Sequence, residues 1–291
     1  MTLRSNEASQ RTMSLAKEAF GRTRVYLLRP QDVSRSNRAL RARGLSDSTR
    51  AKHLRVVGAC LESAVKHGYA ARNVVRDLPR NEKPRPQRKE SGYYTDDELP
   101  RLFRELKGVH CVLCEAALLS GMRLGELTAL RWRDVDLVGG VIAVRRTWTD
   151  GNLGTPKNHE RRDVDIAPAL IERLGVWWGE LGKPADETLV FPGEGATYLS
   201  PTTLLKREFY PGMVRAGIPR EGPTGEKRTF HSLRHTFARI ALENGAELTW
   251  VSRHLGHSGT HVTDQVYGHW SRSAREREAE RLHGAFAGLT R

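Results

Sequence analysis

Cysteine and long apolar runs are scarce in this sequence of 291 residues. The three cysteines Cys60, Cys111 and Cys114 cannot form a disulfide framework, and the CxxC pair among them lies in an apolar helical run, where it fits core packing. No run reaches the roughly 20 apolar residues of a membrane-spanning helix, and the N-terminus lacks the apolar region of a signal peptide. We therefore expect a soluble, cytoplasmic protein with no membrane partner.

Acidic residues are too few to balance the basic ones. The chain has 48 Lys and Arg residues against 34 Asp and Glu residues, a formal net charge of +14. Residues 1–92 hold 21 basic and 8 acidic residues, whereas residues 93–291 hold 27 and 26. Most of the excess is arginine, which suits phosphate better than lysine does. This distribution indicates a polyanionic partner such as DNA, and the candidate DNA contacts are Arg38, Arg41, Arg50, Lys52 and Arg55.

Proline and glycine divide the chain into two domains and a linker. Residues 1–13 are polar and are predicted to be a flexible N-terminus. Residues 14–78 have helical periodicity, broken at Pro30 and Gly44, which predicts a small helical bundle. Residues 79–92 contain three prolines, several charges and almost no apolar residue, which is typical of a linker.

Residues 93–291 are predicted to form a second, mainly helical domain with a small antiparallel β-sheet. Thr95 to Glu98 has the pattern of a capping box, and residues 112–119 are apolar nearly all round, as in a buried helix. The expected fold class is therefore mainly α with a small sheet (α+β). Strands are expected at 135–137, 141–149 and 162–166, and further helices at 167–181, 201–216 and 272–288.

A helix beginning near His231 is predicted to present two different faces. Leu233 and Phe237 belong to an apolar face at helical spacing. His231 and Arg234, three residues apart, share another face, which we expect to point away from the core. A histidine–arginine pair of this kind is more often a solvated surface pair than part of a site.

The same segment continues to a glycine turn and a tyrosine. Gly256 suits the left-handed residue that ends a helix, His257 follows directly, and Tyr267 lies about three helical turns further on. Together these residue types suit a phosphate: arginine can hold its oxygens bidentately, histidine can donate or accept a proton, and tyrosine can attack phosphorus. Each of them alone would more often be structural.

In this order and spacing, these histidine, arginine and tyrosine residues resemble the C-terminal motif of the tyrosine recombinases, the phage integrase family. Arg123 and Glu126, in the pattern G-x-R-x-x-E, resemble the family's first arginine motif. Lys157 matches its β-hairpin lysine, with Lys183 and Lys206 as alternatives. The resemblance implies that an N-terminal helical core-binding domain precedes a catalytic domain.

The resemblance also implies that the chain exchanges DNA strands. Tyr267 would attack the scissile phosphate and form a 3′-phosphotyrosyl intermediate, while Arg123 and Arg234 hold the non-bridging oxygens. Lys157 would protonate the 5′-oxygen as it leaves.

Three further residues are expected to support this chemistry. His231 would accept the tyrosine proton, His257 would hydrogen-bond the phosphate, and Glu126 would either orient the cluster or form a purely structural salt bridge. Two guanidinium groups supply the positive charge that a metal supplies elsewhere, so no metal and no cofactor are expected. A zinc site is the competing interpretation, although no cysteine or carboxylate nearby completes the set of His231, His235, His254 and His257.

The implied partners are duplex DNA recombination sites and further copies of the chain. A terminal helix at about 272–288 would dock on a neighbouring protomer of a homotetramer or fold back on its own domain, through an apolar stripe of Leu282, Ala285, Phe286 and Leu289. The need for an accessory directionality factor is left open. Two other functions also stay open, a type IB-like DNA topoisomerase and a catalytically silent DNA-binding regulator on the same fold. The resemblance implies a bacterial or phage-encoded protein of a mobile element.

Overall fold

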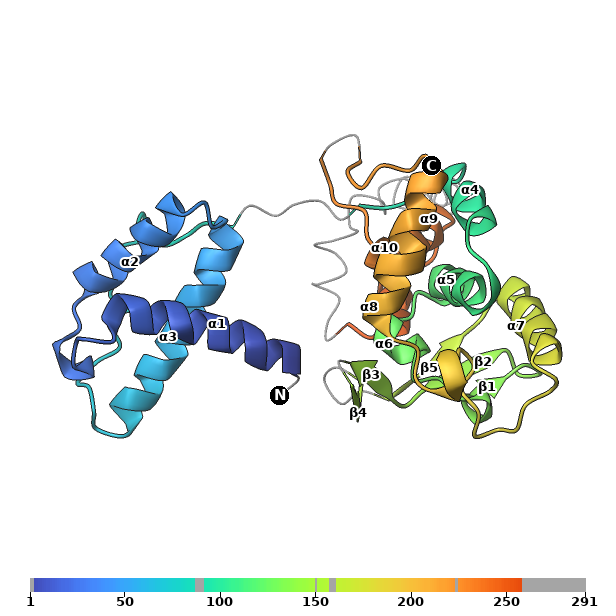
Figure 1. Cartoon of the computed structure of the whole chain (residues 1–291), viewed down its shortest axis with the longest axis horizontal. Coiled ribbons are helices and arrows are strands. Elements are labelled where there is room, and N and C mark those ends of the chain that lie inside the picture. Colours follow the sequence, from blue (N-terminus) through green and yellow to red (C-terminus); the bar gives the residue numbers. More distant parts are fainter. Residues whose placement is uncertain (1–2, 87–91, 150, 157–160, 223–224, 258–291) are drawn as a thin grey trace, which may run out of the picture. The chain divides into compact units, whose positions relative to one another are not determined.

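A computed structural model of the chain describes residues 3–86, 92–149, 151–156, 161–222 and 225–257. The chain divides into two compact units, Met1–Lys89 and Glu90–Arg291 (Figure 1). The helix expected at about 272–288 lies outside the described residues. Among the helices that the structure does describe, none combines the length and the apolar character needed to cross a membrane.

In the described part of the N-terminal unit, three α-helices and a short 3-10 helix pack together. Pro30 begins the second α-helix, where its fixed φ and missing N–H suit the first turn. Ser46 caps the third, since its hydroxyl oxygen accepts from the N–H of Thr49 at 3.3 Å. These elements are α1 (Leu3–Phe20), η1 (Val25–Leu27), α2 (Pro30–Ala42) and α3 (Asp47–Lys66). Their small apolar core consists of Ala16, Val33, Leu54, Val57, Leu61, Val74 and Leu78.

The start of this unit differs from its prediction. Residues 3–13 belong to α1, whereas a flexible N-terminus was expected over residues 1–13. No proline or glycine occurs before Phe20, so nothing interrupts the helix-forming residues of this segment. Polarity alone was therefore a poor guide to helix ends.

The end of the N-terminal unit also differs from its prediction. Residues 79–86 were expected to belong to the linker, but the side chain of Asn37 donates to the Glu82 carbonyl at 2.8 Å. The N–H of Arg85 likewise donates to Asp47 Oδ2 at 2.9 Å. These hydrogen bonds tie the proline-rich segment to α2 and α3. The backbone groups of this segment thus anchor it, although it has almost no apolar side chains to bury.

The second unit is built around α5 (Gly108–Ser120), which is buried as its apolar sequence predicted. It contacts α4 (Glu98–Arg104), α7 (Pro168–Glu180) and α10 (His231–Glu243) (Figure 1). A helix needs neighbours on every side when its whole circumference is apolar. The other helical segments are α6 (Leu124–Leu127), η2 (Trp132–Asp134), η4 (Glu194–Ala196), α8 (Pro201–Thr203), the π-helical η5 (Leu204–Phe209), α9 (Tyr210–Arg215) and α11 (Leu248–Leu255).

A small antiparallel sheet has the strand order β1-β2-β5. Ile142 on β2 pairs with Val164 on β5, and both are buried. A separate two-stranded hairpin of β3 and β4 was not predicted, because the run 141–149 was read as one strand. The predicted fold class, mainly α with a small antiparallel sheet, is confirmed. The strands are β1 (Val135–Asp136), β2 (Val141–Val144), β3 (Thr147–Thr149), β4 (Asn152–Gly154) and β5 (Arg162–Asp165).

Candidate active site

Two left-handed glycines shape the ends of α5 and α11. Gly121 follows α5 with φ of 63°, and Gly256 follows α11 with φ of 62°, the conformation predicted for Gly256. A Cβ on Gly121 would lie 2.7 Å from Cδ2 of Leu255 and 2.7 Å from Cδ1 of Phe237. Only glycine therefore allows the end of α5 to approach the end of α11 this closely.

Arg234 on α10 joins these two helix ends. Its Nη1 donates to the Gly121 carbonyl at 2.7 Å, and its Nη2 donates to the Leu255 carbonyl. Arg234 is only 2 % exposed, so the prediction that its helix face points away from the core is wrong. The carbonyl oxygens compensate for the water that the buried guanidinium has lost.

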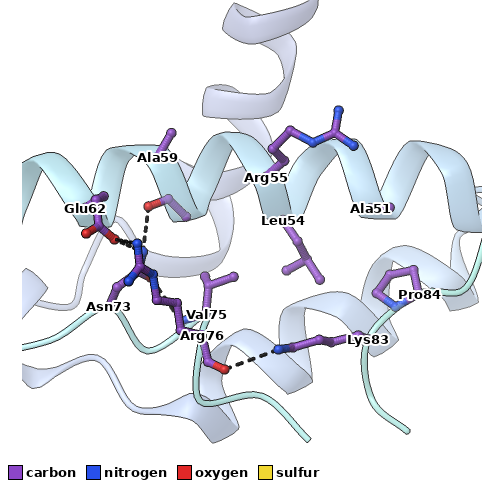
Figure 2. A pocket seen from close by; sticks show the side chains of 11 residues that line it. Ala51, Leu54, Arg55, Ala59, Glu62, Asn73, Val75, Arg76, Lys83 and Pro84 are labelled. Atoms are coloured by element: carbon purple, nitrogen blue, oxygen red, sulfur yellow. Dashed lines mark hydrogen bonds and ion pairs between the residues drawn. The ribbon is translucent and has the colours of Figure 1, made fainter. Parts of the chain in front are cut away.

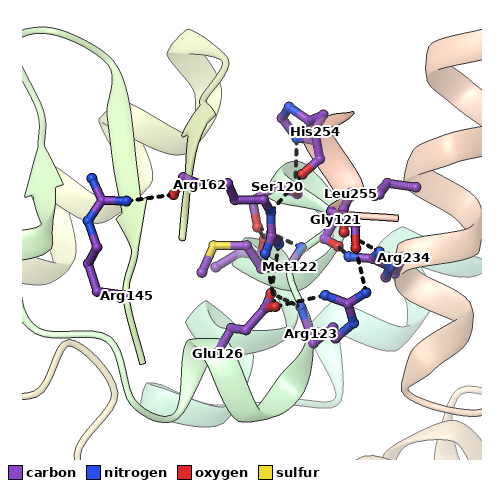
Figure 3. A network of polar contacts seen from close by, with 12 residues as sticks. Ser120, Gly121, Met122, Arg123, Glu126, Arg145, Arg162, Arg234, His254 and Leu255 are labelled. Atoms are coloured by element: carbon purple, nitrogen blue, oxygen red, sulfur yellow. Dashed lines mark hydrogen bonds and ion pairs between the residues drawn. The ribbon is translucent and has the colours of Figure 1, made fainter. Parts of the chain in front are cut away.

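Arg123 reaches the neighbouring carbonyl at the end of α11. Its Nη2 donates to the Gly256 carbonyl at 3.0 Å, and its Nη1 donates to Glu126 Oε1 at 2.9 Å (Figure 3). Since Arg234 contacts the adjacent carbonyl, the structure brings the two predicted arginines together. The Arg123 side chain is 26 % exposed, so it is less enclosed than that of Arg234.

Glu126 lies between two arginines. Oε1 accepts from Arg162 Nη1 at 3.0 Å, and Oε2 accepts from Arg162 Nη2 at 2.8 Å and from the backbone N–H of Arg123 at 2.9 Å. Burial by itself would raise the pKa of Glu126, but the Arg162 hydrogen bonds and the charges of both arginines lower it to about 2. The carboxylate is therefore ionised at neutral pH.

Arg162 was missed by the sequence analysis. Besides the carboxylate of Glu126, it contacts α11, where its Nε donates to the His254 carbonyl at 2.9 Å. The sequence did carry a signal, because alternate residues of a strand share a face, and Arg162 is two residues from the buried Val164. An arginine on the inward face of a strand needs a buried partner.

His231 is the first residue of α10. Part of its surface is open to solvent, but neighbouring protein atoms displace much of the water around the imidazole ring. This desolvation, with the charges of Arg234 and Arg123, lowers the pKa of His231 to about 4. The ring of His235 lies edge-on to it, with 4.8 Å between ring centroids. At neutral pH His231 is therefore uncharged and able to accept a proton.

His257 follows Gly256 directly and is half-buried. Its N–H donates to the Ser252 carbonyl at 3.0 Å, which ties the residue to the end of α11. Desolvation, followed by the charges of Arg234 and Arg123, lowers the pKa of His257 to about 4. The same two arginines thus shift His231 and His257, as expected if all four surround one place.

One of the four histidines considered for a zinc site, His254, takes part in helix packing. His254 is buried, its Nε2 is 2.9 Å from the Ser120 carbonyl oxygen, and its ring stacks on Phe237 and contacts Trp250. It is therefore part of the packing between α5, α10 and α11. Over the residues that the structure describes, no group of three or more His, Cys, Asp or Glu side chains is placed to hold a metal ion.

Two predicted catalytic residues lie outside the described residues. They are Lys157, which falls in the sequence between β4 and β5, and Tyr267, which follows α11. Among the alternative lysines, Lys183 lies over the Trp178 ring at 5.8 Å, and Lys206 is exposed on η5.

The basic residues of the N-terminal unit are of two kinds. The prediction that Arg50 contacts DNA is wrong. Arg50 is only 5 % exposed, and its guanidinium donates to Asn37 Oδ1 at 2.9 Å and to Asp47 Oδ1 at 2.6 Å. It therefore holds α2 to α3 and is not available to DNA. The other candidates, Arg38, Arg41, Lys52 and Arg55, are exposed.

Arg55 borders a pocket of about 500 Å³ beside α3 (Figure 2). Arg76 and Lys83 also line it, and Arg76 forms an ion pair with Glu62 at 2.9 Å. Leu54 also lines the pocket.

Comparison with known proteins places this geometry in context. The model of the phage integrase family matches residues 93–273, which contain every predicted catalytic residue. The chain is 32% identical over 232 residues to the tyrosine recombinase XerC of Xanthomonas campestris pv. campestris, covering 78% of this chain and 65% of that protein. It is 31% identical over 221 residues to the prophage integrase IntR of Escherichia coli, covering 67% of this chain and 50% of that protein. The matches thus span less than two thirds of these relatives' own length.

The fold is also similar to those of solved structures. The Tn1549 transposon integrase in complex with transposon right end DNA has a TM-score of 0.81 at 18% identity, over 97% of this chain and 94% of that chain. A lambda integrase dimer bound to a COC′ core site has a TM-score of 0.73 at 16% identity, over 91% and 89%. Together with the family match over residues 93–273, these findings show that the chain belongs to the phage integrase family of tyrosine recombinases.

Proposed function

We propose that this protein is a site-specific DNA recombinase that cuts and rejoins strands through a covalent bond to Tyr267. The observation that carries the proposal is the convergence of Arg123 and Arg234 on the adjacent carbonyls of Leu255 and Gly256, directly before His257. Two guanidiniums at one place suit a phosphate whose negative charge increases in the transition state. Membership of the phage integrase family supports the same reaction.

The proposed cleavage is a transesterification. The Tyr267 oxygen bonds to phosphorus as the bond from phosphorus to the 5′-oxygen breaks, which leaves a 3′-phosphotyrosine and a 5′-hydroxyl. His231 takes the tyrosine proton, and Lys157 gives a proton to the leaving 5′-oxygen. The 5′-hydroxyl of a partner strand then attacks the phosphotyrosine and releases Tyr267, so no external energy is needed.

The site electrostatics support these assignments. A base must be unprotonated before it acts, and the lowered pKa of His231, about 4, leaves it neutral at physiological pH. His257, also neutral, would hydrogen-bond a phosphate oxygen. Glu126 would orient Arg123, to which it is hydrogen-bonded.

The proposed partners are duplex DNA sites and three further copies of the chain. Exposed Arg38, Arg41, Lys52 and Arg55 of the N-terminal unit would contact backbone phosphates. The segment 272–288 would join protomers into a tetramer on DNA. Truncation after Ser271 should then abolish tetramers in a native gel yet retain binding to a single site, and tetramers that persist would contradict this role. A protein that acts on DNA in this way would work in the bacterial cytoplasm.

Covalent trapping tests the proposed activity. A duplex is first selected from a random-sequence library by its binding to the whole chain, and is then prepared with a nick beside each candidate phosphate. The unaltered protein should give an SDS-resistant adduct, and Tyr267→Phe should bind the duplex equally well but give none, because it lacks only the attacking oxygen. An adduct with Tyr267→Phe would assign the nucleophile to another residue, with Tyr210 the next candidate.

The same experiment separates the two alternative functions. A catalytically silent regulator would bind the selected duplex and form no adduct. A type IB-like topoisomerase would form adducts on any sequence and relax supercoiled plasmids that lack the selected site. A recombinase requires its own site and joins strands from two duplexes.

A further inference from the structure

We infer that Arg162 is a positioning residue of this site, which holds Glu126 and the end of α11 so that Arg123 keeps its place and the cluster of the three side chains keeps a net positive charge. The inference rests on the proposed function and deepens it, because it names a residue that does not itself contact DNA but on which cleavage depends. Arg162 is the first residue of β5, whereas Arg123 directly precedes α6.

The side-chain hydrogen bonds of Arg162 lead to Glu126 and to the end of α11, the two places that hold Arg123. Both oxygens of Glu126 accept from Arg162, at 3.0 and 2.8 Å, and the same oxygens accept from Nη1 and the backbone N–H of Arg123. The Arg162 Nε donates to the His254 carbonyl at 2.9 Å, two residues before the Gly256 carbonyl that Arg123 contacts. Arg123 is thus held by two routes, and Arg162 supports both (Figure 3).

Burial makes these contacts hard to replace. The side chains of Arg162 and Glu126 are 10 % and 1 % exposed. A Cβ on Gly256 would lie 3.1 Å from both Cδ and Nη1 of Arg162, so the guanidinium lies directly against the turn. Removing Arg162 would leave a buried carboxylate with one partner fewer, which is costly.

Charge gives Arg162 a role beyond packing. If Arg123 alone paired with Glu126, the pair would be neutral and would attract a phosphate weakly. With Arg162 sharing the carboxylate, two positive charges face one negative charge, so the cluster keeps a net positive charge beside the proposed phosphate position. A positioned cation that is not neutralised is what stabilises a developing negative charge.

The test uses the full chain and matched variants of neighbouring residues. Arg162→Gln removes the buried cation, and Arg161→Gln removes the same charge from an exposed neighbour in the same strand region. For each protein, the affinity for the selected duplex is measured by gel shift. The single-turnover rate of adduct formation is measured on the nicked duplex under saturating protein, and thermal unfolding reports the fold.

We expect Arg162→Gln to slow adduct formation by about 10- to 100-fold while its affinity for the duplex changes by less than about threefold. Arg161→Gln should cleave at the rate of the unaltered protein. Equal cleavage rates for the two variants would overturn the inference. If the unaltered protein forms no adduct at all, the proposed function fails instead, and the two failures are thereby distinguished.

Two further variants distinguish positioning from stability alone. Arg162→Lys keeps the charge but not the fork, so it should recover part of the rate lost in Arg162→Gln. Adding Glu126→Gln to Arg162→Gln removes the carboxylate that would neutralise Arg123, so the double variant should be no slower than Arg162→Gln. Losses that multiply, or a rate in Arg162→Lys as low as in Arg162→Gln, would show a purely structural residue.

Discussion

At the residue scale, the arginines of this chain differ in how far the protein encloses their side chains. Arg234 and Arg50 are 2 % and 5 % exposed and bind oxygen atoms of their own unit. Arg123 keeps 26 % of its side chain exposed beside the same helix end. A guanidinium has five N–H donors in a fixed fork, so one arginine can bind the protein and still present donors to a phosphate.

The burial of Arg234 predicts a stability effect as well as a catalytic one. Arg234→Ala leaves the Gly121 and Leu255 carbonyls without this donor, and each such loss costs about 1–3 kcal/mol. Arg123→Ala should reduce the free energy of unfolding less, because Arg123 is partly exposed. Urea denaturation of both variants measures the difference, and equal losses would contradict this assignment of burial.

The ion-paired Glu126 predicts an acid-sensitive contribution to stability. Its pKa is about 2 in the folded protein and about 4.3 when unfolded. A depressed carboxyl pKa stabilises the fold above the unfolded pKa, and this contribution is lost as pH falls from about 4.3 towards 2. The free energy of unfolding should therefore drop by roughly 3 kcal/mol over that window. In Glu126→Gln this part of the pH dependence should disappear from urea titrations, and an unchanged slope would refute it.

At the scale of elements, the site is made from helix ends. The C-terminal turns of α5 and α11 present carbonyls to Arg234 and Arg123, and both turns need a residue with positive φ. Carbonyl groups at the last turn of a helix lack partners within the helix. The arginines thus satisfy the helix ends, and the helix ends position the arginines.

This dependence predicts different effects for two glycines that both have a positive φ. Gly245→Ala after α10 and Gly256→Ala after α11 both place alanine at positive φ, which costs about 1–3 kcal/mol of strain. The space around Gly245 is open, but a Cβ on Gly256 would meet Arg162 at 3.1 Å. Both variants should lose thermal stability, whereas only Gly256→Ala should also lose adduct formation. Normal cleavage by Gly256→Ala would count against the turn as a determinant of the site.

At the scale of the whole molecule, charge and chemistry are divided between the two units. Residues 1–92 hold 21 basic and 8 acidic residues, while residues 93–291 are nearly balanced. The proposed catalytic residues all belong to the nearly balanced part. Non-specific affinity for DNA should therefore come mainly from the N-terminal unit.

Salt dependence tests this division. Arg38→Ala and Arg55→Ala each remove one exposed cation and should reduce the slope of log affinity against log salt by about 1. Arg50→Ala should leave the slope unchanged but lower the melting temperature, because Arg50 joins α2 to α3. Fluorescence anisotropy with a labelled duplex measures the slopes. A normal slope in both surface variants would place the DNA contacts elsewhere.

Local patterns in the sequence were sufficient for much of the fold and part of the site. The apolar run of α5 and the left-handed Gly256 depend on neighbours a few residues away, so their behaviour can be predicted from sequence. The motif residues Arg123 and Arg234 were expected to act together, and the structure places both at the end of α11. The positions of Tyr267 and Lys157 relative to them remain predictions.

Only the tertiary structure decided which partners the buried charged residues bind. Arg162 lies 36 residues from Glu126, and Arg234 lies 113 residues from Gly121, so no local periodicity indicates these pairs. In the sequence nothing distinguishes Arg50 from the exposed basic residues near it, but in the structure it donates a hydrogen bond to Asn37 of another helix. A charge leaves water only where distant parts of the chain supply partners for it, and those partners exist only once the chain has folded.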